Sequence, residues 1–264
     1  MEIGLIGCGN MARALARGWG RPLLCADPVA ERARGLAAEV GGEALASNAE
    51  VAARAELLVL CHKPAQLAAV AAEVGAGGPS KTPVASILAV TPLAALREAY
   101  PGRPVYRFIP SLPVEVRQGA VVQAAGPGLV DGGAAGTEGA ALDAAVAELF
   151  AELGTLVVLD DALIDVAMGL MSCAPAYVAL VAEAQVDAGV RRGIPAAQGA
   201  QLVVQTLAGT AELLRRRDYD TMAVRREVSS PGGLTARGVD ALERGGLRRA
   251  FSDALDAVLD GGRR

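Results

Sequence analysis

Short apolar runs recur along the first 157 residues of the chain, and segments of mixed polar and apolar positions separate them. Runs of this kind, bounded by glycine, proline or charged residues, are typical of strands. We therefore predict a strand at each of them. The predicted strands are Ile3–Ile6, Leu23–Ala26, Leu57–Cys61, Val84–Ile87, Val105–Ile109, Ala120–Gln123 and Thr155–Val158.

Helical patterns lie between these strands, as at Met11–Trp19 and Ala30–Val40. A chain that alternates strand and helix predicts a parallel sheet with helices on both faces. Residues 126–139, with the sequence GPGLVDGGAAGTEG, have the composition of a turn-rich loop. The fold expected for residues 1–157 is an α/β domain with a Rossmann-type doubly wound sheet.

Strand patterns stop after residue 160, and only helical patterns follow. Proline at the start of one of them suits the first turn of a helix. Residues 158–264 are therefore expected to form a second, all-helical domain. The predicted helices are Ala162–Arg192, Pro195–Arg217, Thr221–Val228, Leu234–Glu243 and Leu247–Leu259.

The segment Val166–Ala182 carries no charged residue and is apolar on every side. It is shorter than the roughly 20 residues that a membrane span needs, it contains Pro175, and acidic residues flank it. We therefore interpret it as a buried helix rather than a span. The remaining helices are too few to cover it all round, so we expect a second subunit to do so, in a homodimer or a higher homo-oligomer.

Composition narrows the classes of function. The net charge of −4 and the pI near 5.2 argue against nucleic acid as a partner. One histidine and four cysteines without CxxC spacing make a metal site unlikely on ligand count, so none is predicted. The N-terminal residues lack the regions of a signal peptide. A cytoplasmic protein with reduced thiols, bound to no membrane, is the expectation.

The first strand leads directly into the sequence GCGNMA, in which Gly7, Gly9 and Ala12 form a G-x-G-x-x-A pattern. The first glycine permits a tight turn, and the second lets a pyrophosphate approach the backbone. The small third residue lets helix and strand pack closely, and the free N–H groups of the helix start face the phosphates. The position of the pattern between a strand and a helix predicts a dinucleotide site rather than an accidental glycine turn.

Asp27 ends the second predicted strand, where an acidic side chain would bind the diol of a ribose. The same carboxylate would repel the 2′-phosphate of NADPH, so the sequence favours NADH. Arg32 and Arg34 could reach a phosphate, but we assign both to the surface of the following helix. Asp27 could alternatively turn outward and cap that helix.

The sequence CHKP follows the strand that ends at Cys61. Ligands of open parallel sheets bind outside the carboxyl ends of the strands, which places His62 and Lys63 near a bound cofactor. The sequence offers His62 no catalytic partner, so a residue that merely lines the loop is the plainer interpretation.

The helical half contains one unusual turn, REVSSPGGLTARG at residues 225–237. A plain connection between two helices is one interpretation, with Ser230 as the cap and Pro231 as the first helical residue. The glycines and the helix start also supply free N–H groups that suit an anion.

At this point the two halves together resemble one family, pyrroline-5-carboxylate reductase, along nearly the whole chain. The resemblance rests on IGLIGCGNMARAL, HKP, LIDVAMGL…APAYVALVAEA, DAGVRRGIP and VSSPGGLTARGVDALERGGLRRAFSDAL. The S-S-P-G-G-x-T run within a helical domain is its most diagnostic part. The resemblance implies reduction of 1-pyrroline-5-carboxylate to L-proline with NAD(P)H, in proline biosynthesis.

The resemblance also implies roles for individual residues. The turn would bind the substrate carboxylate through Ser230, Gly233, Leu234 and Thr235, and Thr235 would hydrogen-bond the ring nitrogen. Thr235 and Ser230 are accordingly the expected catalytic residues, and Cys173 is expected near the substrate. The residues expected to bind the cofactor are Ile6, Gly7, Cys8, Gly9, Asn10, Met11, Ala12, Asp27, Asn48, Cys61, His62, Lys63, Pro64, Ile87, Leu88 and Ala89.

Several positions depart from the family pattern. Met171 and Cys173 replace small polar residues in a stretch that could also be a kinked core helix. Ser111 replaces an asparagine, Val90 replaces a glycine after the fourth strand, and Glu227 replaces an asparagine. These departures leave open a reductase of another cyclic imino acid, or a catalytically weak dinucleotide-binding protein with a regulatory role.

Overall fold

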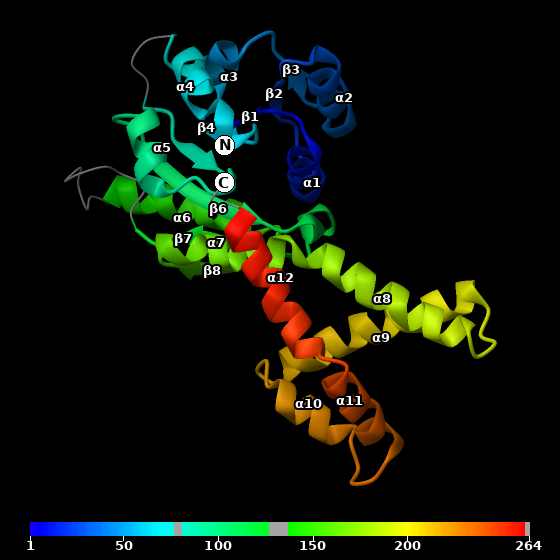
Figure 1. Ribbon diagram of the computed structural model, residues 1–264. Coiled ribbons are helices and arrows are strands. Elements are labelled where there is room, and N and C mark those ends of the chain that lie inside the picture. Colours follow the sequence, from blue (N-terminus) through cyan, green and yellow to red (C-terminus); the bar gives the residue numbers. More distant parts are fainter. Residues whose placement is uncertain (77–80, 127–136, 262–264) are drawn as a thin grey trace. The chain divides into compact units, whose positions relative to one another are not determined.

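The computed structural model describes residues 1–76, 81–126 and 137–261. By its internal contacts the chain divides into two compact units, Met1–Pro175 and Ala176–Arg264. The first unit contains the sheet and the second is helical (Figure 1). The expected fold class, a Rossmann-type domain followed by an all-helical domain, is confirmed. The domain boundary that we predict after residue 157 falls within the last strand, Gly154–Leu159, and stays a prediction.

The first unit is built on an eight-stranded sheet with the order β3-β2-β1-β4-β5-β6-β7-β8. All seven predicted strands are present, and β3 is an additional two-residue strand at the edge. The strands are β1 (Ile3–Ile6), β2 (Leu24–Ala26), β3 (Glu43–Ala44), β4 (Leu57–Leu60), β5 (Val84–Ser86), β6 (Val105–Pro110), β7 (Gly119–Ala124) and β8 (Gly154–Leu159).

The prediction of a wholly parallel sheet is wrong at one junction. Strands β1 to β6 are parallel, but β7 runs antiparallel to β6, and β8 is parallel to β7. Only a short 3₁₀ segment, η2 (Leu112–Val116), joins β6 to β7. A connection of this length returns the chain beside its own strand, whereas a parallel partner needs a long crossover.

Helices cover both faces of the sheet. Helices α1, α2 and α6 pack with one cluster of buried side chains, and α3, α4, α5 and α7 pack with the other. The helices of this unit are α1 (Asn10–Trp19), α2 (Ala30–Val40), α3 (Asn48–Arg54), α4 (Leu67–Gly75), α5 (Leu93–Ala99), α6 (Thr137–Ala151) and α7 (Ile164–Ala167), with 3₁₀ segments η1 (Pro64–Gln66) and η3 (Asp161–Leu163).

Three aromatic side chains pack together where α6 meets the sheet. Phe108 of β6 stacks on Phe150, with ring centroids 3.8 Å apart, and Trp19 meets the edge of the same ring at 5.5 Å. The indole N–H of Trp19 donates to the carbonyl of Leu149 at 2.9 Å. These contacts anchor α6 on the sheet. Of the predicted loop at 126–139, residues 127–136 lie outside the described residues, and α6 already begins at Thr137.

The predicted helix 162–192 is not one regular helix. Residues Met168–Ser172 form a π-helical segment, η4, and α8 (Ala174–Val190) follows. The N–H of Cys173 donates to the carbonyl of Met168, five residues earlier, at 3.2 Å. A π-helical turn of this kind is an established cause of a kink.

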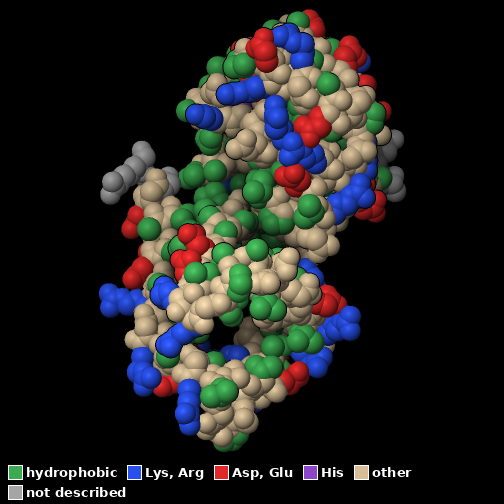
Figure 2. Space-filling view, turned by 90° about the vertical axis from the view of Figure 1, so that its right-hand side faces the viewer, with side chains coloured by type: hydrophobic (Ala, Val, Ile, Leu, Met, Phe, Trp, Pro, Cys, Tyr) green, Lys and Arg blue, Asp and Glu red, His purple; other side chains and the backbone are tan. Residues whose placement is uncertain are grey.

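The second unit has hardly any core of its own. Within the described residues, α8, α11 and α12 contain no buried side chain, and α10 buries only Val224. Figure 2 shows apolar side chains exposed on the surface of this unit. Its helices, besides α8 from Ala176 onward, are α9 (Ala196–Arg216), α10 (Thr221–Glu227), α11 (Leu234–Arg244) and α12 (Leu247–Gly261).

One helical stretch, Asp161–Val190, has the length and hydropathy of a membrane span, and 17% of its most apolar window is buried. Length and composition alone are weak evidence for a membrane, because core helices of soluble proteins pass the same test. The expectation that this stretch is buried is therefore not met within the single chain. Its apolar surface needs a cover that the described residues do not provide.

A buried arginine ties the sheet to the start of this stretch. Arg107 of β6 is 1% exposed, and its guanidinium donates to the carboxylates of Asp161 at 2.8 Å and Asp165 at 2.5 Å. The other oxygen of Asp161 accepts the N–H of Leu93, the first residue of α5, at 3.0 Å. One guanidinium thus fixes a strand, the start of α5 and the first turns of the long helix.

We expect Arg107→Met to lower the free energy of unfolding by about 3 kcal/mol, because two partly buried carboxylates then lose their partner. Urea unfolding followed by circular dichroism measures this loss. The matched control is Arg17→Met, which also removes an arginine paired with two carboxylates, Glu39 and Glu115, but on the solvent-exposed surface. Solvent screens exposed pairs, so the control should change stability much less. Equal losses in the two variants would contradict the role assigned to Arg107.

Candidate active site

The glycine loop has the conformation that the sequence predicts. Gly7 has a φ of 95°, and a side chain there would collide with the backbone of Cys61 and His62 at 2.9 Å. Gly9, in contrast, has open space where a side chain would be. Only glycine therefore fits the first position, and the second leaves room for a ligand against the backbone.

The start of α1 is prepared for an anion. Gly9 is its N-cap, no side chain caps it, and its first turn contains no acidic residue. Ala12 is buried between α1 and the sheet, as its small size predicts, and Met11 packs against the same core. The free N–H groups of the first turn carry the positive end of the helix dipole, which suits a phosphate.

The carboxylate of Asp27 is held in place by two backbone groups. Its Oδ2 accepts the N–H of Cys8 at 2.8 Å, and its Oδ1 accepts the N–H of Val29, also at 2.8 Å. The N-cap of α2 is Val29, so the alternative in which Asp27 caps that helix is wrong. The bond to Val29 is instead an Asx turn. The negative charge therefore lies directly beside the glycine loop.

These groups surround a cavity of about 330 Å³ at the carboxyl ends of β1, β2 and β4. This is the edge of the sheet at which α/β domains bind their ligands. Eight of the predicted cofactor residues line it, namely Ile6, Gly7, Gly9, Asp27, Asn48, Cys61, His62 and Lys63.

Other predicted residues do not line this cavity. Leu88 is buried in the core, and Pro64 lines a different groove. The cavity also has lining residues that our sequence analysis did not assign, and Arg32 is the most consequential of them. We expected Arg32 on the outer surface of α2, but it lines the cavity, whereas Arg34 pairs with Glu31 at 2.8 Å. The remaining unassigned lining residues are Pro28, Val29, Gln66 and Val70.

His62 presents an unpaired nitrogen in this region. Its Nδ1 donates to the carbonyl of Lys63 at 2.9 Å, since a carbonyl oxygen can only accept. Its Nε2 is buried and has no hydrogen-bond partner among the described residues. Burial lowers the pKa of His62 below its usual value, which keeps the ring neutral and Nε2 an acceptor. A hydroxyl of a bound ligand would satisfy that acceptor.

The neighbouring thiols stay protonated. A hydrogen bond with Cys25 and burial raise the pKa of Cys8, and burial raises the pKa of Cys61. All four cysteines are free. Uncharged thiols beside the glycine loop do not oppose a phosphate. Within the described residues no group of His, Cys, Asp and Glu could hold a metal ion.

Asn48, another predicted cofactor residue, begins α3. Its side-chain amide donates to the carboxylate of Glu73 in α4 at 2.6 Å. Ser47 caps α3 by accepting the N–H of Glu50 at 3.2 Å. Cap and amide bond together fix the position of Asn48 at the cavity.

In the turn after β5, a departure from the pattern of the resembling family places a valine in an unfavourable backbone conformation. Val90 stands where the family has glycine, and its φ is 53°. This left-handed conformation is unfavourable for a β-branched residue and free of strain for glycine. The chain thus keeps the backbone path of a glycine turn beside Ile87 and Ala89 without the residue that suits it.

The turn at 230–233 has the features of a type II β-turn. Pro231 is its second residue, Gly232 is its third with a φ of 71°, and the N–H of Gly233 donates to the carbonyl of Ser230 at 3.0 Å. Helix α11 then begins at Leu234, with Gly233 as its N-cap and no side-chain cap. The segment does connect two helices, but the assignment of Ser230 as the cap and Pro231 as the first helical residue is wrong.

The predicted substrate groups of this turn are free to bind. Ser230, Leu234 and Thr235 are exposed, and neither hydroxyl makes a hydrogen bond within the described part of the chain. A side chain at Gly233 would come within 2.4 Å of the Ser230 hydroxyl oxygen. The turn thus assembles two hydroxyls and an uncapped helix start in one place of the second unit.

Cys173, the remaining predicted substrate residue, belongs to the first unit. It follows the π-helical segment and is half-buried, while Met171 packs against the core of the sheet. The hydroxyl of Ser172 donates to the carbonyl of Pro110 at 3.0 Å. The stretch is therefore not a regular α-helix, in agreement with the interpretation as a kinked core helix.

Family models match two separate stretches of the chain. Residues 161–264 match the family model described as pyrroline-5-carboxylate reductase dimerisation. Residues 2–90 match the model described as NADP oxidoreductase, coenzyme F420-dependent.

Similar proteins extend over the whole chain. The pyrroline-5-carboxylate reductase of Synechocystis sp. is 33% identical over 98% of this chain and 96% of its own length. The 1-pyrroline-5-carboxylate reductase structure from Streptococcus pyogenes is 26% identical, with a TM-score of 0.85 over 99% of this chain and 98% of its own. The Plasmodium falciparum pyrroline carboxylate reductase with NADP bound shares the fold, with a TM-score of 0.84 at 23% identity over 99% of this chain and 97% of its own. The chain belongs to the pyrroline-5-carboxylate reductase family.

Proposed function

We propose that this protein reduces 1-pyrroline-5-carboxylate to L-proline with NAD(P)H. The observation that supports this most is the exposed Ser230–Thr235 turn, whose two hydroxyls make no hydrogen bond within the described chain, in a member of this family. The turn has the chemistry of a carboxylate receptor without a lysine or arginine.

The cofactor cavity fits a dinucleotide in three respects. Gly9 leaves space at the backbone, α1 begins without a cap, and the buried Nε2 of His62 needs a donor. Gly7 and Gly9 would hold the pyrophosphate, and Asp27 would accept hydrogen bonds from a ribose. The reduced nicotinamide supplies a hydride.

The turn would bind and orient the imino acid. The N–H groups of Leu234 and Thr235 and the hydroxyl of Ser230 would donate to the substrate carboxylate. The Thr235 hydroxyl would hydrogen-bond the ring nitrogen and hold the carbon–nitrogen double bond in position. A protonated imine is already electrophilic, so the residues contribute mainly through orientation.

A reductase of a different cyclic imino acid is the alternative. Met171 and Cys173 are larger and less polar than the family residues, and Met171 is committed to the core. A weakly catalytic, regulatory protein is the third possibility, and the intact Ser230–Thr235 turn opposes it.

The four free cysteines support the cytoplasm as the compartment of this reaction.

The first test is turnover with several cyclic imines, measured by the loss of NADH or NADPH absorbance. We expect 1-pyrroline-5-carboxylate to give the highest kcat/KM. Faster reduction of another imine would favour the alternative substrate, and cofactor binding without turnover of any imine would favour the regulatory protein.

In the same assay Thr235→Ala should lower kcat roughly 10²–10⁴-fold, the usual range for a positioned hydrogen-bond or proton donor, with little change in cofactor affinity. Thr221→Ala is the matched control, because Thr221 is also an exposed threonine at the start of a helix. An unchanged rate in Thr235→Ala would remove this residue from the mechanism.

We propose a preference for NADH over NADPH. The Asp27 carboxylate is fixed beside the glycine loop by two N–H donors, where it would repel a 2′-phosphate. Arg32 at the rim of the same cavity acts in the opposite direction. The balance of these two charges decides the selectivity.

The ratio of kcat/KM for NADH to that for NADPH measures this balance. It should exceed one in the native protein, fall in Asp27→Ser, and rise in Arg32→Gln. Arg34→Gln is the matched control, because Arg34 lies on the same helix and pairs with Glu31 away from the cavity. A native preference for NADPH, or a ratio that Asp27→Ser leaves in place, would refute the proposal.

We further propose that the helical unit is completed by a second copy of the chain, in a homodimer or a larger homo-oligomer. The unit exposes large apolar side chains on several helices, including Leu180, Leu202 and Leu234. The match to a dimerisation family over residues 161–264 supports the same conclusion. Apolar area of this kind is stable in water only when a partner covers it.

Analytical ultracentrifugation should find a dimer or larger species at micromolar concentration. Leu180→Glu, in α8, should weaken association by about tenfold or more, the typical effect of a buried interface residue. Val116→Glu, an equally exposed apolar residue of η2 in the first unit, is the matched control. A stable folded monomer of the native protein would contradict the proposal.

A further inference from the structure

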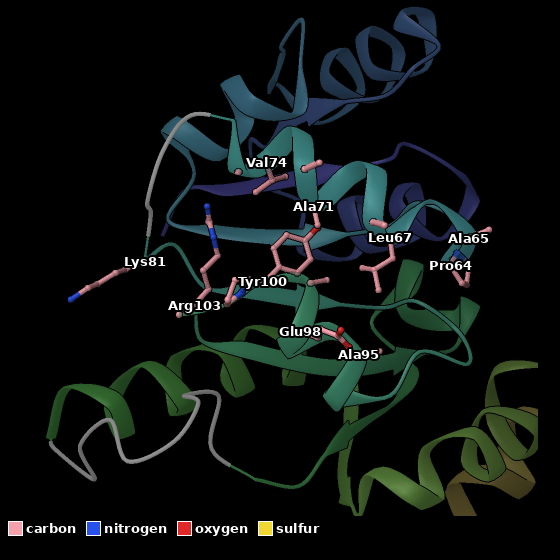
Figure 3. A pocket seen from close by; sticks show the side chains of 16 residues that line it. Pro64, Ala65, Leu67, Ala71, Val74, Lys81, Ala95, Glu98, Tyr100 and Arg103 are labelled. Carbon is pink, nitrogen blue, oxygen red and sulfur yellow. The ribbon is translucent and has the colours of Figure 1, made fainter.

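A second, larger cavity lies in the first unit, away from the glycine loop. It has a volume of about 1190 Å³ and is bordered by η1, α4, α5 and the segment that follows α5 (Figure 3). Its volume is somewhat above the range of about 300–1,000 Å³ that is usual for small-molecule sites. We call it the α4–α5 groove. Nothing in the proposed reaction uses it.

The two cavities meet different faces of the same helix. Val70 of α4 lines the cofactor cavity, whereas Leu67, Ala68 and Ala71 line the groove. The wall of the groove is aliphatic, and alanines of α4 and α5 leave its volume open. An apolar body fits such a wall, but small residues alone would not define a ligand.

Tyr100 provides the first polar feature. The side chain is 2% exposed, yet its hydroxyl has no hydrogen-bond partner in the described chain. Figure 3 shows the ring within the groove, with the hydroxyl directed toward Ala71 of α4. Burial raises the pKa of Tyr100, so the hydroxyl stays a donor. Buried donors are almost always paired, and an unpaired one calls for an explanation.

Arg103 provides the second polar feature of the groove. It is 5% exposed, and its guanidinium donates one hydrogen bond to the described chain, to the carbonyl of Thr82 at 3.3 Å. None of the ion pairs among the described residues includes Arg103. Glu98 lines the groove without pairing with Arg103, and Lys81 adds a second cation to the lining. A buried guanidinium without an acid is costly and is stabilised by an anion.

Arg103 and Tyr100 line the same groove and lie three residues apart in the segment that follows α5. The cation and the phenol are therefore polar groups of one otherwise apolar groove. Carboxylates match both the planar fork of a guanidinium and the hydroxyl of a phenol.

We propose that the α4–α5 groove binds a small amphipathic carboxylate. Its carboxylate pairs with Arg103, the Tyr100 hydroxyl donates to an oxygen of the ligand, and its hydrocarbon lies against Leu67, Ala68 and Ala71.

Isothermal titration calorimetry of the full-length protein with straight-chain carboxylates, from butanoate to decanoate, tests the proposal. At least one of them should bind saturably, and the amine and alcohol of the same chain length should bind more weakly. Absence of saturable binding by the whole series at millimolar concentration would overturn the proposal, and so would equal binding of the amine.

Two variants locate the site. Ala68→Phe places a ring in the groove and should abolish binding, whereas Ala69→Phe, on the adjacent exposed position that does not line the groove, should leave it unchanged. Tyr100→Phe removes only the hydroxyl and should weaken binding roughly tenfold. Carboxylate binding that survives in both Ala68→Phe and Tyr100→Phe would place the ligand elsewhere and refute the assignment.

Discussion

The pairing of Arg107 with Asp161 and Asp165 is the constraint on which the architecture of the first unit depends. The guanidinium is buried in the sheet, where an unpaired charge is not tolerated, so the two carboxylates must come to it. Both belong to the first turns of the stretch that leads into the helical unit. The position at which the chain leaves the sheet is therefore set by charge, and not by the apolar pattern alone.

The cofactor cavity depends on a different constraint, the close approach of backbone segments. Gly7 is in contact distance of Cys61 and His62, which brings the ends of β1 and β4 together. The Asp27 carboxylate then links the end of β2 to the same loop through Cys8. Val90 shows that the surrounding backbone is kept even where the sequence no longer suits it, because a valine adopts the conformation of the missing glycine.

The helical unit follows a third principle. Its helices expose apolar side chains that no described residue of the chain covers. The stability of the unit is therefore coupled to its assembly. The Ser230–Thr235 turn has a fixed local geometry nevertheless, because proline, a left-handed glycine and the bond from Gly233 to Ser230 are all local. A preformed turn can thus bind a carboxylate without reorganisation.

The sequence by itself determined the strands of the sheet, the glycine loop and the turn at 230–233. Each depends on residues close in the chain, whether an apolar run, a glycine at a left-handed position or a proline before a glycine. The family was also evident from such local motifs, since the turn and the loop are read directly from neighbouring residues.

Only the tertiary structure decided the antiparallel pairing of β7 with β6, the position of Arg32 at the cofactor cavity and the pairing of Arg107. It also decided that the Tyr100 hydroxyl in the α4–α5 groove is buried without a partner among the described residues. In each case the outcome depends on segments far apart in the chain. No local sequence pattern specifies which charged residue a buried group will contact. Burial and long-range pairing are properties of the assembled sheet and its helices, and the sequence specifies them only through the fold.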